Sequence, residues 1–399
     1  MPRTPRGKAL AAAGLAGLLA AGGVTAVLVT RSGGDDRPGA AAGAPSAAEA
    51  EEALTAPSAQ ASLLAPSPEA ALVPASPTTE EETAGGDRDD AGGDGDAAGA
   101  QDEGAGGGDG AAAPVRAALF VNPDAQVRRW LDDHPDDGRR DVIADSIANR
   151  PQGVWFTQYD PSSITGDVRA ITSAAEASGT VPVLVSYMLP NRDCGGASSG
   201  GAPGTDAYDA WMDRFAAGIG AGPAIVILEP DSLALDDCLS GVDRDARRAS
   251  LARAVDTLHD AAPQARVYLD AGHSQWHDPA EMADRLEAAG ALDGADGIFT
   301  NVANFRATDQ ETAYAKAVLD ALGGGLHAVI DTSRNGNGPV GEEWCDPPGR
   351  RVGHAPTTDT GDPDIGAYLW VKPPGEADGC AADAGTFSPQ IAYDLALGN

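Results

Sequence analysis

Positive charge is scarce in this chain. Its 399 residues include 27 Lys and Arg against 60 Asp and Glu, which gives a formal net charge of −33 at pH 7. An acidic surface of this strength repels phosphate groups, so we exclude nucleic acid and anionic membrane surfaces as partners. It fits an uncharged substrate and a highly soluble, exported protein.

Histidine and cysteine are also few, at six and four residues. Neither an HExxH nor a CxxC spacing occurs, so we expect no metal site and no cofactor. The cysteines are Cys194, Cys238, Cys345 and Cys380. An even, sparse set in an exported chain is typical of two disulfides, and the residues alone leave all three connectivities open.

Residues 31–114 contain no Trp, Tyr, Phe or Cys and consist largely of Ala, Gly, Pro, Ser, Asp and Glu. Such a segment buries too little apolar area to offset its ordering entropy, so we predict a disordered acidic linker. In residues 1–30, three basic residues precede an apolar run that begins at Ala9. This pattern predicts an export signal. The run is long enough to span a bilayer, so residues 9–30 are expected to be either a cleaved signal or a retained membrane anchor. The protein would then be secreted, or held on the outside of the cell membrane.

Residues 115–399 differ in composition, because strand-like apolar runs here alternate with helical patterns such as those within 206–221 and 244–261. This alternation predicts a parallel sheet with crossover helices. We therefore predict one α/β domain, a distorted and incomplete TIM-like β/α barrel of about seven strands. Its first run, AALFVNP, is short and irregular, which is why we expect the barrel to be incomplete.

The predicted strands end in polar residues. In chain order these are Asp193, Asp231, Asp270, Asn301, Asn304, Asp331, Lys372, Glu376 and Asp378. A single Asp at a strand end is readily explained as the N-cap of the next helix. A whole ring at matching strand ends indicates a site, because the loops after barrel strands open on one face. Carboxylates paired across a cleft are typical of glycoside hydrolysis.

The sequence Glu229-Pro230-Asp231 is the sharpest of these strand ends. An apolar run precedes Glu229, which places Asp231 at the mouth of a strand. We expect the charge of Glu229, together with partial burial, to raise the pKa of Asp231, as a general acid near neutrality requires.

Seven motifs resemble one family in content and order. They are SYMLPNRDC, ILEPDSLA, YLDAGHSQW, TNVANF, IDTSRNGNGP, EWCDPPGR and WVKPPGEADG. The chain from about residue 120 to 399 is similar to glycoside hydrolase family 6, the inverting cellulases, and most to its actinobacterial endo-β-1,4-glucanases. The resemblance implies an incomplete β/α barrel and hydrolysis of β-1,4-glucan with inversion of anomeric configuration.

The resemblance also implies roles for five catalytic residues. Asp231 corresponds to the general acid, Asp193 to an auxiliary carboxylate and Asp378 to the proposed base. Whether Asp378 acts directly or a water relay runs through Asp193 stays open. Tyr187 corresponds to the tyrosine under the sugar at the cleavage site, and Ser199 to the serine that positions the water.

Further residues are implied to bind substrate. They are Lys372, Glu376, Trp276, Trp344, His273, Asn304 and Asp270. The two tryptophans would stack on sugar rings, with core packing as the alternative. The resemblance also implies the disulfide pairs Cys194–Cys238 and Cys345–Cys380.

The sequence favours internal cutting over cutting from chain ends. GEADG runs directly into Cys380, which leaves no long insertion to roof the cleft as in cellobiohydrolases, and Pro279 stands where some of those enzymes carry a further tryptophan. The alternatives are a cellobiohydrolase, a non-catalytic glucan-binding protein, which has no need of a raised carboxyl at Asp231, and a metal-dependent barrel hydrolase. We expect a monomer whose partner is a β-1,4-glucan chain.

Overall fold

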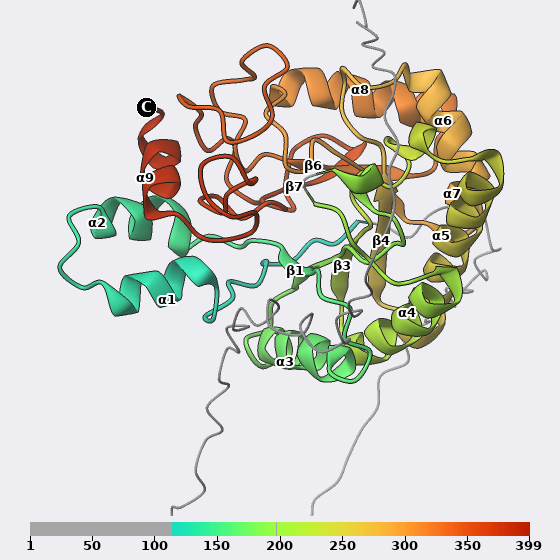
Figure 1. The fold of residues 1–399 in the computed structure, drawn as a ribbon, viewed down its shortest axis with the longest axis horizontal. Helices are drawn as coiled ribbons and strands as arrows, with labels where there is room; N and C mark the ends of the chain where they lie inside the picture. The colour runs from blue at the N-terminus through green and yellow to red at the C-terminus, as the bar shows by residue number, and fades with distance from the viewer. Residues whose placement is uncertain (1–113, 197) are drawn as a thin grey trace, which may run out of the picture. The chain divides into compact units, whose positions relative to one another are not determined.

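The computed structural model describes residues 114–196 and 198–399. The predicted signal or anchor and, apart from Pro114, the predicted linker lie outside the described residues. The domain is built on one parallel sheet of seven strands that pair in chain order (Figure 1). The strands are β1 Val154–Phe156, β2 Val183–Ser186, β3 Ala224–Leu228, β4 Ala265–Asp270, β5 Gly297–Thr300, β6 His327–Asp331 and β7 Ile365–Leu369. The predicted α/β class and incomplete seven-stranded barrel are confirmed.

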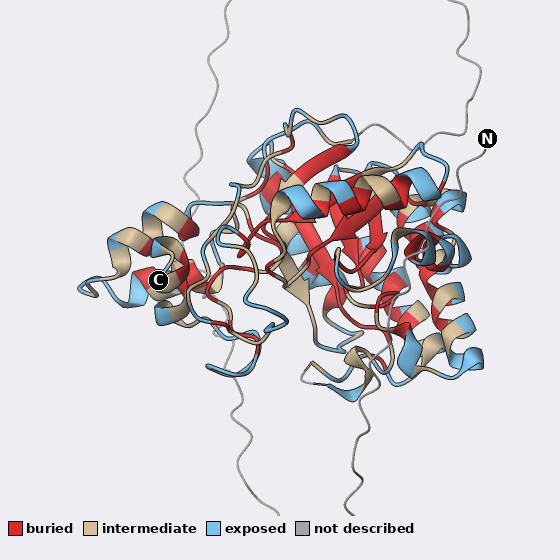
Figure 2. Ribbon diagram, turned by 90° about the horizontal axis from the view of Figure 1, so that it is seen from above, coloured by how far each residue is buried: buried red, intermediate tan, exposed pale blue. Residues whose placement is uncertain are grey.

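Alternate strand residues point to two different cores. Val183, Val185 and Ile227 belong to an inner cluster enclosed by the sheet, whereas Leu184 and Val226 pack against the helices outside it. Figure 2 shows most of the sheet buried and the exposed residues mainly on the helices and loops, while β1, beside the opening of the barrel, is only partly buried. Burial on both faces explains why these strands read as continuous apolar runs.

Helices cover the outer face of the sheet. They are α3 Ile164–Ala177, α4 Thr205–Ile219, α5 Gly241–Ala261, α6 Pro279–Ala288, α7 Ala291–Gly294 and α8 Thr308–Ala321. The helical patterns seen within 206–221 and 244–261 are α4 and α5. Ser240 accepts a hydrogen bond from the backbone N–H of Asp243 and so caps α5. Among residues 114–196 and 198–399, no helix combines the length and hydropathy that crossing a membrane requires.

The barrel is open between β1 and β7. Across this gap the backbone N–H of Gly153 donates to Trp370 O at 2.8 Å. The run AALFVNP forms an isolated bridge, Leu119 with Val181, instead of an eighth strand. Four helical segments gather beside the opening around a small apolar cluster of their own (Figure 1). They are α1 Gln126–Asp133, α2 Arg140–Ile143, the π-helical turn η1 Ala144–Ala148 and α9 Pro389–Leu397.

Candidate active site

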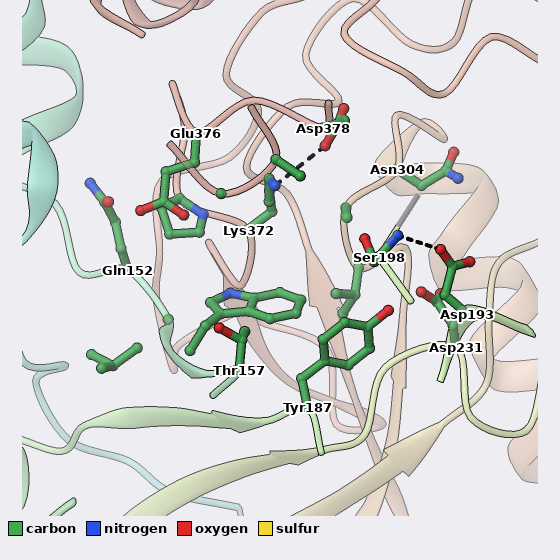
Figure 3. A pocket seen from close by; sticks show the side chains of 18 of the residues that line it. Gln152, Thr157, Tyr187, Asp193, Ser198, Asp231, Asn304, Lys372, Glu376 and Asp378 are labelled. Carbon is green, nitrogen blue, oxygen red and sulfur yellow. Dashed lines mark hydrogen bonds and ion pairs between the residues drawn. The ribbon is translucent and has the colours of Figure 1, made fainter. Parts of the chain in front are cut away.

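The loops after the strands, together with the segment before β1, line an open cavity of about 1040 Å³ (Figure 3). Eleven of the predicted site residues line it. They are Tyr187, Asp193, Ser199, Asp231, His273, Trp276, Asn304, Trp344, Lys372, Glu376 and Asp378. The motifs are far apart in sequence, and the ends of β2 to β7 bring them together as the parallel topology requires.

Asp231 lies on a sharp turn after β3. Glu229 and Asp231, on either side of Pro230, both have positive φ, at 54° and 66°. The turn places Asp231 in the cavity wall, half-buried. Burial raises the pKa of Asp231 well above its ordinary value, and the charges of Asp270 and Asp193 act in the same direction. The carboxyl is thereby kept protonated near neutrality.

Glu229 does not contribute to this shift, which corrects our expectation. The turn directs its side chain away from Asp231 and into the protein, where it is 1% exposed. Its Oε2 accepts the backbone N–H groups of Met188 at 2.7 Å and Leu189 at 2.9 Å. Burial raises the pKa of Glu229 to about 7. This carboxyl fastens the loop after β2 to the end of β3.

Asp270 is the predicted site residue that does not line the cavity. It is 1% exposed, and its carboxylate accepts backbone N–H groups from Leu233, Ala234 and Gly272 at 2.9 to 3.1 Å. The predicted contact of Asp270 with substrate is therefore wrong. Asp270 lies behind the cavity wall, where its charge acts on Asp231. Asp331, another member of the predicted ring, is equally buried. It accepts the N–H groups of Ala303, Ser333 and Lys372.

Asp193 comes from the glycine-rich loop after β2. Its Oδ2 accepts the backbone N–H of Ser198 at 2.6 Å (Figure 3). A side chain at Gly196 would collide with this carboxylate, since an added Cβ would fall 2.6 Å from Oδ2. The disulfide Cys194–Cys238 joins this loop to the loop that follows Asp231, which confirms the implied pair.

Asp378 enters the cavity from the loop after β7. Its Oδ2 accepts Arg334 Nη1 at 2.7 Å and the backbone N–H of Asp346 at 3.1 Å. Lys372 Nζ lies 3.4 Å from the other carboxylate oxygen. Asp378 is 7% exposed. Two cations therefore flank this one buried carboxylate.

A second set of contacts fixes the loop that carries Asp378. Asp346, at φ 48°, accepts the backbone N–H groups of Asp378, Cys380 and Ala381 at 2.7 to 3.0 Å. The disulfide Cys345–Cys380 ties the same two segments together and confirms the second implied pair. Burial would raise the pKa of Asp346, but the three N–H donors outweigh it and hold that pKa below its usual range.

Tyr187 is held at the base of the cavity by its neighbours. The Arg192 guanidinium lies 4.6 Å from the centre of its ring, and the ring of Trp155 meets it edge-on at 5.5 Å. Arg192 also donates to Ser198 O at 2.8 Å and to Thr157 O at 3.0 Å. One guanidinium thus connects the ends of β1 and β2 with the glycine-rich loop.

Aromatic and neutral groups line other parts of the cavity. His273 accepts the backbone N–H of Gln275 through Nδ1 and lies 5.1 Å from the Trp276 ring. Burial and, to a lesser degree, the charge of Arg306 together lower the pKa of His273 to about 4, so its imidazole is neutral near pH 7. Trp344 is 51% exposed. This exposure suits a ring that stacks on a sugar, whereas a ring packed in the core would be buried.

The prediction from sequence missed three residues of this site. Trp155, within GVWFTQY, lines the cavity, and its place in a strand leading to the same face could have identified it. Arg334, within IDTSRNGNGP, is the buried ion-pair partner of Asp378. The only sequence feature that could have indicated it is a basic residue three positions after the end of a buried strand. Gln126 also lines the cavity, and nothing in its local sequence marks it.

Among the described residues, one group has the spacing to hold a cation. It consists of Asp237, His277 and Glu281. Arg285 already donates to Asp237 Oδ2 at 2.9 Å and to Glu281 Oε1 at 2.6 Å. None of the three lines the cavity. Arg285 therefore already pairs with both carboxylates of this group, and the group lies outside the cavity.

A cavity with a carboxyl whose pKa burial raises, a carboxylate paired with two cations and flanking aromatic rings is typical of a glycoside hydrolase. The chain belongs to glycosyl hydrolases family 6, whose family model matches residues 115–396, and it is a cellulase.

Two curated endoglucanases and one solved structure illustrate the similarity. The chain is 52% identical to endoglucanase 1 of Streptomyces sp. (strain KSM-9) over 291 residues, 73% of this chain and 81% of that protein. It is 50% identical to endoglucanase A of Thermobispora bispora over 290 residues, 72% of this chain and 64% of that protein. Its structure matches the endoglucanase Cel6 from Mycobacterium tuberculosis in complex with methyl-cellobiosyl-4-deoxy-4-thio-β-D-cellobioside. The TM-score is 0.67 at 41% identity, covering 71% of this chain and 97% of that one.

Proposed function

We propose that this cellulase is an endo-β-1,4-glucanase that cuts glucan chains internally and inverts the anomeric carbon. The observation that carries the proposal is the contrast between two acids of one cavity. Asp231 is kept protonated by burial and by the charges of Asp270 and Asp193, whereas Asp378 is paired with Arg334 and Lys372. One group is equipped to give a proton and the other to remain a carboxylate.

In the proposed reaction, Asp231 gives its proton to the glycosidic oxygen as the bond from that oxygen to C1 breaks. A water attacks C1 from the opposite face, and its proton passes to a carboxylate. The products are a chain with a new 4-hydroxyl and a chain whose new hemiacetal has the inverted configuration. Proton exchange with solvent then restores Asp231 and the base.

Two carboxylates are candidates to receive the proton of the water. Asp378 accepts two donors at Oδ2, which leaves Oδ1, beside Lys372, to act directly. Asp193 accepts one backbone N–H and is close enough to Asp231 to raise its pKa, so it fits the relay route. Both routes give the same product configuration.

Tyr187 and Ser199 would act on substrate and water respectively. Tyr187, fixed by Arg192 and Trp155, supports the sugar ring at the cleavage site. Binding energy from the neighbouring aromatic and polar groups would distort that ring toward the transition state. Ser199 is exposed on the glycine-rich loop, where it would orient the water.

Internal cutting is supported by the segment that follows Asp378. Instead of a long insertion, residues 375–388 fold back on themselves, with Glu376 bridged to Phe387. The disulfide Cys345–Cys380 holds this hairpin down. A short, fastened hairpin has no length to roof the cavity. The named relatives are also endoglucanases.

Export of the enzyme is the second part of the proposal. The basic and apolar character of residues 1–30 supports it, as do two disulfides, which persist in oxidising compartments. N-terminal sequencing of the protein from culture medium and from washed membranes would separate a cleaved signal from a retained anchor. Recovery from the cytoplasm alone would contradict export.

Viscosity and reducing ends, followed together on carboxymethyl-cellulose, test the mode of action. An endo-acting enzyme lowers the viscosity steeply for each new reducing end. Slow viscosity loss, with cellobiose as the main product, would identify a cellobiohydrolase. Binding to glucan without any new reducing end would identify a non-catalytic binding protein.

A further inference from the structure

Gln126, the first residue of α1, lies outside the barrel repeat but reaches its cavity. Helix α1 precedes β1 in the sequence and lies at the open side of the barrel near α9 (Figure 1). Gln126 therefore comes from the opposite end of the domain sequence to the hairpin that carries Glu376 and Asp378.

The amide of Gln126 makes three hydrogen bonds, all to that hairpin. Its Nε2 donates to Glu376 Oε1 at 2.7 Å and to Gly385 O at 2.8 Å, and its Oε1 accepts the backbone N–H of Phe387 at 3.1 Å. Because Nε2 is a donor and Oε1 an acceptor, these contacts together set which way the amide faces.

The hairpin is built to present Glu376 at this point. Backbone bonds join Ala377 to Thr386 and Gly385, and Ser388 to Gly375. Gly375 has φ 101°, and a Cβ there would fall 2.7 Å from the ring of Phe387. The strands of the hairpin therefore pack more closely than any residue but glycine allows at this position.

We propose that Gln126 is a positioning residue for glucan binding, which orients the Glu376 carboxylate so that Oε2 accepts a sugar hydroxyl. Glu376 Oε1 accepts a hydrogen bond from Gln126, and no described residue donates a hydrogen bond to Glu376 Oε2. This inference rests on the proposed function, since it names one contact through which the enzyme would bind glucan.

The charges around Glu376 make its ionisation sensitive to Gln126. Burial raises the pKa of Glu376 to about 7, while Lys372 from the loop after β7, the Gln126 donor and Arg129 from α1 each favour the carboxylate. Removal of the Gln126 donor therefore raises the pKa of Glu376 further. The fraction of enzyme with an accepting carboxylate then falls near neutrality.

The test is a double-mutant cycle on the full chain, with cellohexaose as substrate. We expect Gln126→Leu to raise KM by about tenfold while kcat changes less than about twofold, because the lost bond has a charged acceptor. The acid limb of kcat/KM should move to higher pH. Glu376→Gln should remove the contribution of Glu376 to the acid limb of kcat/KM. In the Glu376→Gln background, Gln126→Leu should raise KM far less than it does in the parent.

The controls separate this role from a structural one. Gln390→Leu changes an exposed glutamine on α9 that bonds Asp394 and does not line the cavity, and it should leave KM and the pH profile unchanged. An equal KM effect of Gln126→Leu with and without Glu376→Gln would overturn the proposal, since Gln126 would then act through the hairpin backbone alone.

A binding measurement distinguishes failure of this inference from failure of the proposed function. Calorimetry of cellohexaose with the same variants, each carrying Asp231→Asn, reports affinity without turnover. If the parent does not cleave glucan yet Gln126→Leu weakens binding, the hydrolysis proposal fails and the positioning role stands. If the parent cleaves glucan and binding is unaffected by Gln126→Leu, the positioning role fails alone.

Discussion

Arg334 and Asp378 form a buried ion pair, with Nη1 2.7 Å from Oδ2 and side-chain exposures of 2% and 6%. Arg334 comes from the loop after β6 and Asp378 from the loop after β7. The guanidinium also lies 4.4 Å from the ring centre of Phe305, which leaves it little access to water. A residue of the proposed mechanism is thus also a residue on which the fold depends.

Removing Asp378 should destabilise the protein as well as inactivate it. Asp378→Ala leaves the Arg334 charge buried without its partner, which costs about 3–5 kcal/mol in comparable pairs. Urea unfolding of the variant measures this loss. The double variant Arg334→Met with Asp378→Ala removes the stranded charge, so it should unfold at higher urea than Asp378→Ala alone. A single variant as stable as the parent would show that the pair contributes nothing.

Replacing Asp270 should narrow the pH range of activity from the alkaline side. In the proposed mechanism Asp231 acts in its protonated form, so activity should fall as pH rises through its pKa. Asp270→Asn removes a negative charge that raises this pKa. The alkaline limb of kcat should therefore move to lower pH. Glu229→Gln is the matched control, because Glu229 is equally buried after β3 but turned away from Asp231. No movement in Asp270→Asn would show that burial alone sets the pKa of Asp231, and equal movement in both variants would show that the Asp270 charge has no specific effect.

Loss of the Cys345–Cys380 disulfide should lower stability by about 4 kcal/mol in the chain-entropy model, given its sequence separation of 35. The bridge also fastens the hairpin that carries Asp378, so kcat of the Cys345→Ser, Cys380→Ser double variant should fall. Urea unfolding and initial rates at a temperature well below unfolding measure the two effects. An unchanged unfolding midpoint would mean that the Asp346 contacts alone hold the hairpin.

Two tryptophans should respond in opposite ways to truncation. Trp344 lines the cavity and is 51% exposed, so Trp344→Ala should weaken glucan binding and leave the free energy of unfolding almost unchanged. Trp211 on α4 is fully buried, and Trp211→Ala should cost about 3–5 kcal/mol. Binding isotherms and denaturant curves on both variants give the comparison. A large stability loss in Trp344→Ala would place its ring in packing.

Strand periodicity predicted the barrel and the polar strand ends that line the cavity, whereas the resemblance to the family supplied the remaining residues. These are Tyr187, Ser199, His273, Trp276 and Trp344. Apolar runs buried on both faces mark the strands, and their polar ends must meet on one face of a parallel sheet. Which acids face the cavity was harder to predict. Glu229 and Asp231 differ by two positions, and only the left-handed turn around Pro230 decides that one faces the core and the other the cavity.

Contacts between distant loops escaped prediction for a related reason. Asp270 was assigned to the cavity because it ends a predicted strand and lies in a motif that resembles the family's cleft, yet its carboxylate accepts backbone N–H groups of the neighbouring loop. Gln126 reaches Glu376 only after α1 docks beside the hairpin, a tertiary event that leaves no local pattern.

The measurement that tests the central claim most directly compares two substrates in the parent and in Asp231→Ala. Cellohexaose has a leaving group that must be protonated, whereas 2,4-dinitrophenyl β-cellobioside releases a phenolate that needs no proton. If Asp231 is the general acid, the variant should lose cellohexaose hydrolysis by several orders of magnitude and keep most of its activity on the aryl cellobioside. Loss of both activities to the same extent would contradict that role, and so would full activity on cellohexaose.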